Sequence, residues 1–292
     1  MSQLLSEISH TPADEVKLDF VRQIQSTFGP EKCYAWPGAR VAVKRIASVG
    51  FGGDFHAVTH GPNEQHSIVV GTVSGPGLVA ALAKAVISGA IHKFSPADRS
   101  PIGLLVSLSD LLGRLNADLS PRAVTCSVFH GLIDCAKGTL GYCMAGRVRP
   151  YVRTRKGVLQ ELSVESPALG RSTDVKLRVG SLKVNSIERL LIHTEGLCEA
   201  CSATGESYGP TQSRQILTDT AVLPVDRQLA AVVEAVHTHV GAISTLTDDV
   251  TLFAAAFAEE TTNIPRVDAV NDLFKWYGES SGFRPDSSVF LG

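Results

Sequence analysis

The chain has 292 residues, 44% of them hydrophobic, and its 27 basic and 29 acidic side chains give a net charge of −2. This length allows one large or two small domains with a substantial core, and we expect one. The two signs of charge are mixed along the sequence, which excludes the basic footprint of a protein that binds nucleic acid or an anionic membrane.

The N-terminus has no basic stretch followed by an apolar core, and no apolar run approaches the ~18 residues that span a bilayer. We therefore expect a cytoplasmic protein. Six cysteines are scattered along the chain, a pattern that predicts reduced thiols more than a disulfide framework. Cys198 and Cys201 form a Cys-x-x-Cys pair, which is a weak zinc or redox signal without a second ligand pair.

The first predicted element is an amphipathic helix. Thr11 and Pro12 are typical of a helix start, and apolar residues recur at helical spacing over 16–28 before the break at Gly29 and Pro30. We assign residues 1–37 to this helix and a linker.

A strand predicted over 40–48 leads into Phe-Gly-Gly-Asp-Phe-His at 51–56. Segments 57–59 and 67–70 then form a predicted hairpin, whose second strand ends in a turn of small residues at 71–77. Glycines in that turn would let the backbone approach an ion or a phosphate closely.

The remaining predicted elements are mostly strands joined by hairpins, with few helical crossovers. The predicted helices cover 77–94, 102–119 and 225–240, and we expect the first two to pack side by side on one sheet face. The predicted strands cover 123–133, 139–145, 148–153, 158–162, 189–194 and 247–253. This order predicts an α+β fold.

Four stretches together resemble the SpoIIE/RsbU-type branch of the metal-dependent PP2C-like serine/threonine phosphatases. Gly-Gly-Asp-Phe at 52–55 matches as it stands, and Thr-Asp-Asp-Val-Thr-Leu at 247–252 matches the closing Asp-Asp-x-Thr-Leu. Segments 72–77 and 194–200 resemble Asp-Val-Ser-Gly-His-Gly and Thr-Asp-Gly-x-x-Glu-Ala. The resemblance covers about residues 16–257 and implies a four-layer αββα sandwich, with two antiparallel sheets and the site at one end of them.

By this resemblance, each candidate site residue takes a family role. The candidate catalytic residues are Asp54, Thr72, Glu195, Asp248 and Asp249; the candidate metal ligands are Asp54, Glu195 and Asp248; and the candidate substrate-binding residues are Ser74, Gly75 and Arg147. All the acids are predicted at strand ends, which favours convergence at one edge.

The chain departs from the family wording at four motif positions. Thr72 replaces the metal-bridging Asp, Pro76 and Arg147 replace His, and Glu195 replaces Asp. The family's chemistry uses two dications about 3.5–4 Å apart, whose repulsion an anionic bridge offsets. A threonine hydroxyl is neutral and shorter, and Glu195 moves its charge by one methylene. We therefore expect at most one weakly bound Mn or Mg ion, or none.

Two hypotheses follow. The four departures favour a catalytically impaired pseudophosphatase, acting as a regulatory or phosphoprotein-binding module whose partner is a phosphorylated Ser/Thr protein or a regulatory protein. The retained Asp248 and Asp249 keep open an active Mn/Mg-dependent phosphatase with a rearranged centre built on Asp54, Glu195 and Asp248. Neither hypothesis needs nucleic acid or a membrane, and a homodimer is a further partner considered.

We assign residues 38–258 to the phosphatase-like domain and 259–292 to a C-terminal extension. The extension has an apolar stripe at helical spacing, formed by Val267, Val270, Leu273, Phe274 and Tyr277, with Trp276 beside it. The stripe predicts a short helix docked on the domain, with a dimer or partner contact as the alternative.

Overall fold

The computed structural model describes residues 31–36, 38–48, 52–61, 64–75, 78–93, 100–119, 123–163, 166–172, 175–241 and 246–258. The helix predicted over 16–28 and the extension 259–292 lie outside these residues. The helices among these residues include no candidate for a membrane span.

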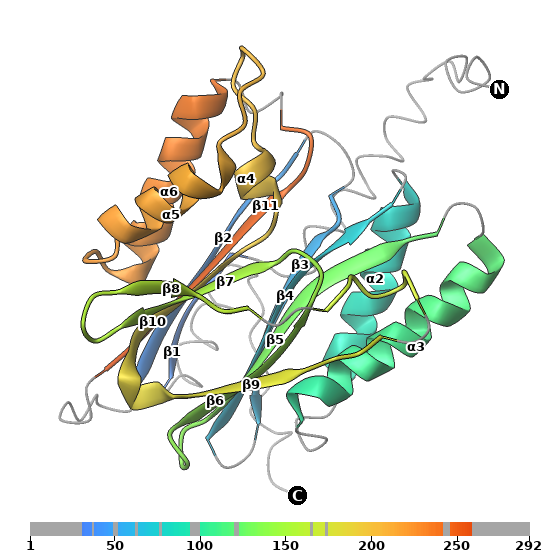
Figure 1. Ribbon diagram of the computed structural model, residues 1–292, viewed down its shortest axis with the longest axis horizontal. Coiled ribbons are helices and arrows are strands. Elements are labelled where there is room, and N and C mark those ends of the chain that lie inside the picture. The colour runs from blue at the N-terminus through green and yellow to red at the C-terminus, as the bar shows by residue number, and fades with distance from the viewer. Residues whose placement is uncertain are drawn as a thin grey trace, which may run out of the picture.

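Two antiparallel sheets form the centre of the molecule (Figure 1). The six-stranded sheet has the order β1 (Cys33–Trp36), β2 (Ala39–Ile46), β11 (Val250–Phe257), β10 (Ile187–His193), β7 (Arg149–Thr154) and β8 (Leu159–Glu161). The five-stranded sheet has the order β3 (Asp54–Gly61), β4 (Gln65–Ser74), β5 (Thr125–Asp134), β6 (Thr139–Ala145) and β9 (Val179–Lys183).

The main core lies between the sheets, and strand alternation explains how it forms. Val41 and Val43 of β2 face this core, whereas Ala42 between them belongs to the apolar cluster on the other face of the sheet. The opposite sheet contributes Ile68 and Phe129 to the same core. Successive strand residues point to opposite faces, so each apolar strand feeds two layers of packing.

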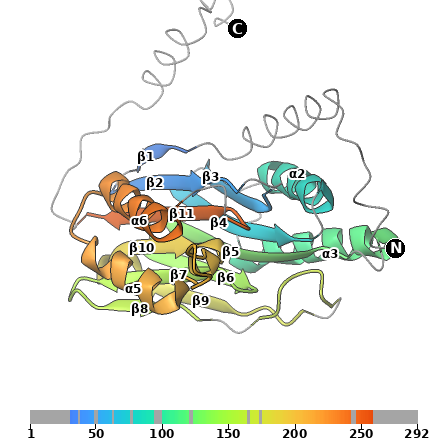
Figure 2. The same ribbon diagram turned by 90° about the horizontal axis from the view of Figure 1, so that it is seen from above.

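Helices cover both outer faces. On the five-stranded sheet lie α2 (Leu78–Lys93) and α3 (Pro101–Leu119), and on the six-stranded sheet lie α4 (Gly196–Glu199), α5 (Gly209–Asp219) and α6 (Val225–Val240). Figure 2 shows the resulting layers from above. The helices pack on the sheets through apolar side chains, such as Ile87 and Leu105 on the five-stranded sheet and Leu229 and Val232 on the six-stranded sheet. The predicted four-layer αββα sandwich is confirmed.

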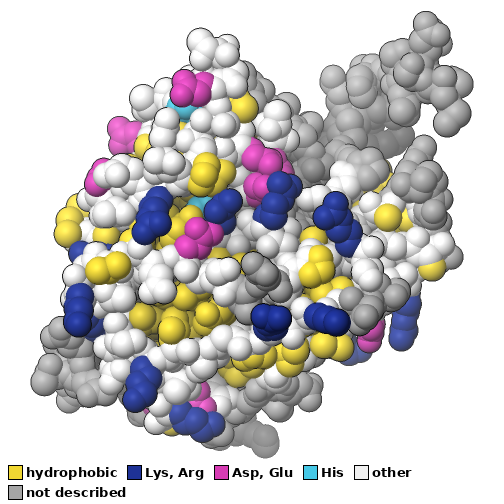
Figure 3. Space-filling model, viewed as in Figure 1, with side chains coloured by type: hydrophobic (Ala, Val, Ile, Leu, Met, Phe, Trp, Pro, Cys, Tyr) yellow, Lys and Arg dark blue, Asp and Glu magenta, His cyan; other side chains and the backbone are white. Residues whose placement is uncertain are grey.

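On the face in Figure 3, Lys and Arg side chains are spread over most of the surface, and Asp and Glu side chains lie mostly in its upper half.

Several boundaries differ from the prediction. Strand β4 continues to Ser74, so the segment predicted as a turn from Gly71 is still paired, with Thr72 opposite Ser127 of β5. Hydrogen bonding to β5 keeps this segment in the sheet, although its glycines had predicted a turn. Strands β1 and β9 and helix α5 were not predicted: the two strands are short, and α5 starts at Gly209-Pro210, which is typical of a turn as well as of a first helical turn.

Candidate functional site

The pairing of β3 with β4 sets the geometry of the first candidate residues. Asp54 is the first residue of β3 and lies directly opposite Thr72. The neighbouring pair is hydrogen bonded, with the Val73 N–H donating to the Gly53 carbonyl at 3.0 Å. Asp54 and Thr72 therefore form a non-hydrogen-bonded pair, in which the two side chains stand close together on one face. Both are buried.

Asp54 is a buried carboxyl group with one oxygen satisfied. The Thr194 hydroxyl donates to Oδ2 at 2.7 Å, while Oδ1 has no hydrogen-bond partner. Burial, and next the negative charge of Asp249, raise the pKa of Asp54 to about 7. The hydroxyl of Thr72 is likewise buried without a hydrogen bond. The predicted resemblance assigns the bridging carboxylate of the family to position 72, and the structure has there a buried hydroxyl group without a hydrogen-bond partner, opposite Asp54.

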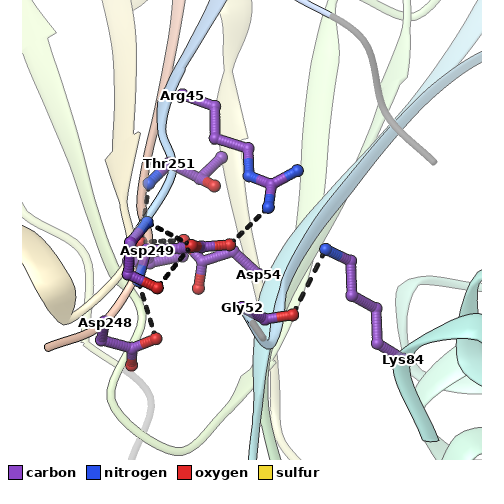
Figure 4. A network of polar contacts seen from close by, with 9 residues as sticks. Arg45, Gly52, Asp54, Lys84, Asp248, Asp249 and Thr251 are labelled. Atoms are coloured by element: carbon purple, nitrogen blue, oxygen red, sulfur yellow. Dashed lines mark hydrogen bonds and ion pairs between the residues drawn. The ribbon is translucent and has the colours of Figure 1, made fainter. Parts of the chain in front are cut away.

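Both carboxylate oxygens of Asp249 accept hydrogen bonds from other residues of the chain (Figure 4). Arg45 of β2 donates to Oδ2 at 2.6 Å, and Ser48 donates to Oδ1 from its N–H at 2.8 Å and from its hydroxyl at 3.1 Å. A Cβ at Gly52 would lie 1.7 Å from Oδ2, so only glycine admits this carboxylate. Such a buried, fully paired acid fits a structural role.

Lys84 brings a second cation toward the acids. It is fully buried on the sheet-facing side of α2, and its Nζ lies 3.5 Å from the Gly52 carbonyl oxygen. Figure 4 shows it extending from α2 toward that loop. Burial lowers the pKa of Lys84 to about 8, and the nearby charge of Arg45 adds to this, while Asp249 and Asp54 act in the opposite direction.

Asp248 precedes β11 and accepts the Asp249 N–H at 2.8 Å on Oδ1. Burial raises the pKa of Asp248. This hydrogen bond joins neighbouring residues in a turn, and no described hydrogen bond involves the other carboxylate oxygen of Asp248.

Glu195 follows β10 and is paired with Arg147 at 2.5 Å, Nη1 to Oε1. Gly146 adopts a φ of +76° that places Arg147 after the end of β6, and the Arg147 N–H donates to the Ser127 hydroxyl at 3.2 Å. Burial and the charge of Glu199 raise the pKa of Glu195. Glu195 and Arg147 are both departures from the family wording, and the structure joins them.

The structure therefore brings Asp54, Thr72, Asp248 and Asp249 to one end of the sandwich, while Glu195 is held by Arg147 at its side. Ser74 is exposed at the end of β4, and Gly75 follows it. Arg45, Lys84 and Thr194 were not predicted as site residues. The sequence could have indicated Lys84, because it is the one charged residue on the α2 face that carries buried Ala80, Ile87 and Ile91.

A two-cation centre can be tested against these donors. Within the described residues, no three His, Cys, Asp or Glu side chains lie close enough together to hold a metal ion. Arginines occupy Asp249 and Glu195, and the bridge position is a neutral hydroxyl. The donor set does not fit two Mn or Mg ions, which require several hard, anionic oxygens in near-octahedral array.

The family model for stage II sporulation protein E (SpoIIE) matches residues 62–258 of this chain. The chain belongs to the SpoIIE family. The predicted resemblance is thereby confirmed, and the structural neighbours are PP2C-type phosphatase domains.

A curated relative is protein IcfG of Synechocystis sp., which is 25% identical over 228 residues, covering 70% of this chain and 36% of IcfG. The chain thus spans about a third of that relative's length.

Among solved structures, the SiaA-PP2C domain of Pseudomonas aeruginosa has a TM-score of 0.66 at 20% identity, with 83% of this chain and 96% of that one covered. The RsbU and RsbW domains of a Mycobacterium tuberculosis protein give a TM-score of 0.62 at 21% identity, covering 86% and 71%. RsbX in complex with magnesium gives 0.54 at 14% identity, covering 78% and 100%. These likenesses show the PP2C-like fold.

Proposed function

We propose that this SpoIIE-family domain is a catalytically impaired pseudophosphatase that acts as a regulatory or phosphoprotein-binding module. The observation that carries the proposal is the ion pair between Arg147 and Glu195. Two of the four departures from the family pattern contact each other, so the substitution at one position supplies the charge partner for the other. A cation of the chain itself stands beside the acid that the family pattern would give to a metal.

The other acids support the same proposal. Arg45 neutralises Asp249, and Lys84 lies buried within the field of Asp54 and Asp248. A dication entering here would meet resident positive charge and no carboxylate at position 72. Near neutral pH, Asp54 would also be partly protonated, which weakens it further as a metal ligand.

A binding role has a candidate contact in Arg147. Its side chain is 71% exposed although it is paired with Glu195. A guanidinium can hold a phosphate group through two parallel hydrogen bonds, so Arg147 could exchange Glu195 for the phosphate of a phosphorylated Ser or Thr on a partner protein. Ser74 and Gly75, at the end of β4, are further contacts proposed for that phosphoprotein.

The second candidate function is an active Mn/Mg-dependent protein serine/threonine phosphatase with a rearranged centre. The observation that favours it is the free Oδ1 of Asp54 together with the uncommitted oxygen of Asp248. These two acids, with Glu195 released from Arg147, would hold at most one weakly bound ion. Location in the cytoplasm and formation of a homodimer remain predictions under either function.

Turnover of an aryl phosphate, with manganese or with chelator, distinguishes the two functions. We expect a rate near background that chelator does not change. A chelator-sensitive rate that is lost in Asp248→Asn would establish the second function instead. For the binding role, we expect a phosphoserine peptide array to retain the wild type better than the matched unphosphorylated array, and Arg147→Gln to remove that preference.

A further inference from the structure

A cavity lies at the end of the sandwich opposite the candidate site. Strands β2 and β11 pair antiparallel, with Arg45 and Val250 at the site and Ala39 and Phe257 at the far end. There a cavity of about 740 Å³ opens between the sheets, within the ~300–1,000 Å³ typical of ligand pockets. We call it the distal cavity.

The inner wall of the distal cavity is apolar. Trp36 and Phe257 of one sheet and Ile133 of the other line it, and all three belong to the core cluster between the sheets. The cavity is therefore a continuation of the inter-sheet core that the described residues leave unfilled. An occupant would contact both sheets at once.

The rim of the distal cavity is basic. Lys137, Arg155 and Lys183 line it, and no Asp or Glu is among the described lining residues. Lys137 pairs with Asp134 at 3.1 Å, but the described hydrogen bonds of Arg155 go only to main-chain carbonyls. A basic rim around an apolar wall selects an occupant that is apolar and acidic.

The end of β11 is fixed in the wall of this cavity. The Ala258 N–H donates to the Gly38 carbonyl at 2.8 Å, and Arg155 donates to the carbonyls of Phe257 and Ala258 at 3.0 and 2.9 Å. The chain after Ala258 therefore starts beside the rim. Since each residue spans at most ~3.6 Å, Glu259 and Glu260 follow Ala258 within about 7 Å of chain.

The sequence that follows has both required properties. Within residues 259–277, four acids, at positions 259, 260, 268 and 272, outnumber two bases, at positions 266 and 275. The apolar stripe over 267–277 recurs at helical spacing, so one face of this segment could fill an apolar hollow. The acidic and apolar character of residues 259–277, and the position of Ala258 beside the rim, both favour this segment as the occupant of the distal cavity.

We propose that residues 259–277 of this chain dock in the distal cavity. The stripe packs against Trp36, Ile133 and Phe257, and the acids pair with the basic rim. The extension then joins the two sheets at the end away from the candidate site.

Cysteine reactivity in the full chain tests this docking. Cys135 lines the distal cavity, whereas Cys33 is exposed on β1 and serves as an internal reference. We expect iodoacetamide to alkylate Cys135 about tenfold faster in Phe274→Gln than in wild type, because opening of the docked segment controls access. Cys33 should react equally in both, and Trp276→Gln, altered beside the stripe, should behave like wild type. Peptide mass spectrometry measures both rates.

A charge exchange provides the second arm. Lys183 is exposed, so Lys183→Glu should leave the fold intact while accelerating alkylation of Cys135, and adding Glu260→Lys should slow it again. Equal rates for Cys135 in wild type, Phe274→Gln and Lys183→Glu would overturn the proposal. Protection of Cys135 that grows with protein concentration would also overturn it, because the occupant would then be a second copy.

Discussion

Asp54 shows how far the candidate site depends on single hydrogen bonds. Its carboxyl group is buried at the start of β3, and the hydroxyl of Thr194 donates a hydrogen bond to it at 2.7 Å. The same hydroxyl accepts the Thr251 N–H at 2.9 Å, so Thr194 connects β10 with β11 and with the opposite sheet. Removing the Thr194 hydroxyl takes one hydrogen bond from the buried Asp54 carboxyl group and one from the buried Thr251 N–H.

Thr194→Val should therefore lower the free energy of unfolding by about 1–3 kcal/mol, the cost of leaving buried polar groups unsatisfied. Thr211→Val, at an exposed position of α5, is the matched control and should change it by less than about 0.5 kcal/mol. Urea unfolding measures both values. Equal stability of the two variants would show that Asp54 does not depend on Thr194.

Repair of the site tests three of the four departures in combination. Thr72→Asp with Glu195→Asp restores two carboxylates of family length, and Arg147→His removes the competing guanidinium. The triple variant should bind manganese and gain slow, chelator-sensitive phosphatase activity, and the double variant should gain less of both because Arg147 remains. If a folded triple variant binds manganese no better than wild type, Pro76 and the surrounding loop are the next cause to test.

At the scale of elements, burial of the charged Lys84 side chain under α2 lowers the stability of the fold. Burial lowers its pKa to about 8 against the pull of the nearby acids, so desolvation outweighs attraction and charged Lys84 destabilises the folded state. Lys84→Met should raise stability at pH 7 by up to about 3 kcal/mol, the free energy that corresponds to the fall of the lysine pKa from 10.5 to about 8.

The gain from Lys84→Met should shrink gradually above pH 8. Between the folded pKa of about 8 and the ordinary lysine pKa of 10.5, the unfolded chain keeps a proton that the folded chain has released, so wild-type stability rises with pH. Lys93→Met, exposed at the end of the same helix, should change stability little at any pH. Thermal and urea unfolding at pH 7 and pH 9 measure this. A loss of stability in Lys84→Met at pH 7 would mean that the acids require its charge.

The elements also show what the sequence could predict. Hydrophobic periodicity predicted α6 over 225–240 as observed, and the order of motifs predicted the family and the sandwich. The contacts of the acids were not predictable, because Arg45 and Asp249 are 204 positions apart and meet only through the pairing of β2 with β11. The end of β4 was misplaced for the same reason: its partner strand decides where it stops.

For the whole molecule, buried histidines should set the response to acid. Burial lowers the pKa of His66, His130 and His193 to about 4 each. Below pH 6.5 the unfolded chain takes up protons that the folded chain refuses, so each histidine lowers stability by up to about 1.4 kcal/mol per pH unit. The raised pKa of Asp54, about 7, acts in the opposite direction, since the folded state then binds the extra proton.

Three histidines against one strongly shifted carboxyl group predict a net loss of stability from pH 6.5 to pH 5. In Asp54→Asn the opposing contribution is absent, so the loss should be steeper. Urea unfolding at pH 7, 6 and 5 measures both slopes. Constant or rising stability in wild type over this range would contradict the buried, neutral state of these histidines.

Calorimetric titration of the wild-type protein with manganese at pH 7 is the most direct test of the proposed loss of the two-metal centre. Because Arg147 and Arg45 occupy Glu195 and Asp249, and Thr72 supplies no bridge, we expect no binding with a stoichiometry of two, and at most weak binding of one ion. Saturable binding of two manganese ions per chain, with ions bridged within about 4 Å in a crystal of the complex, would contradict it.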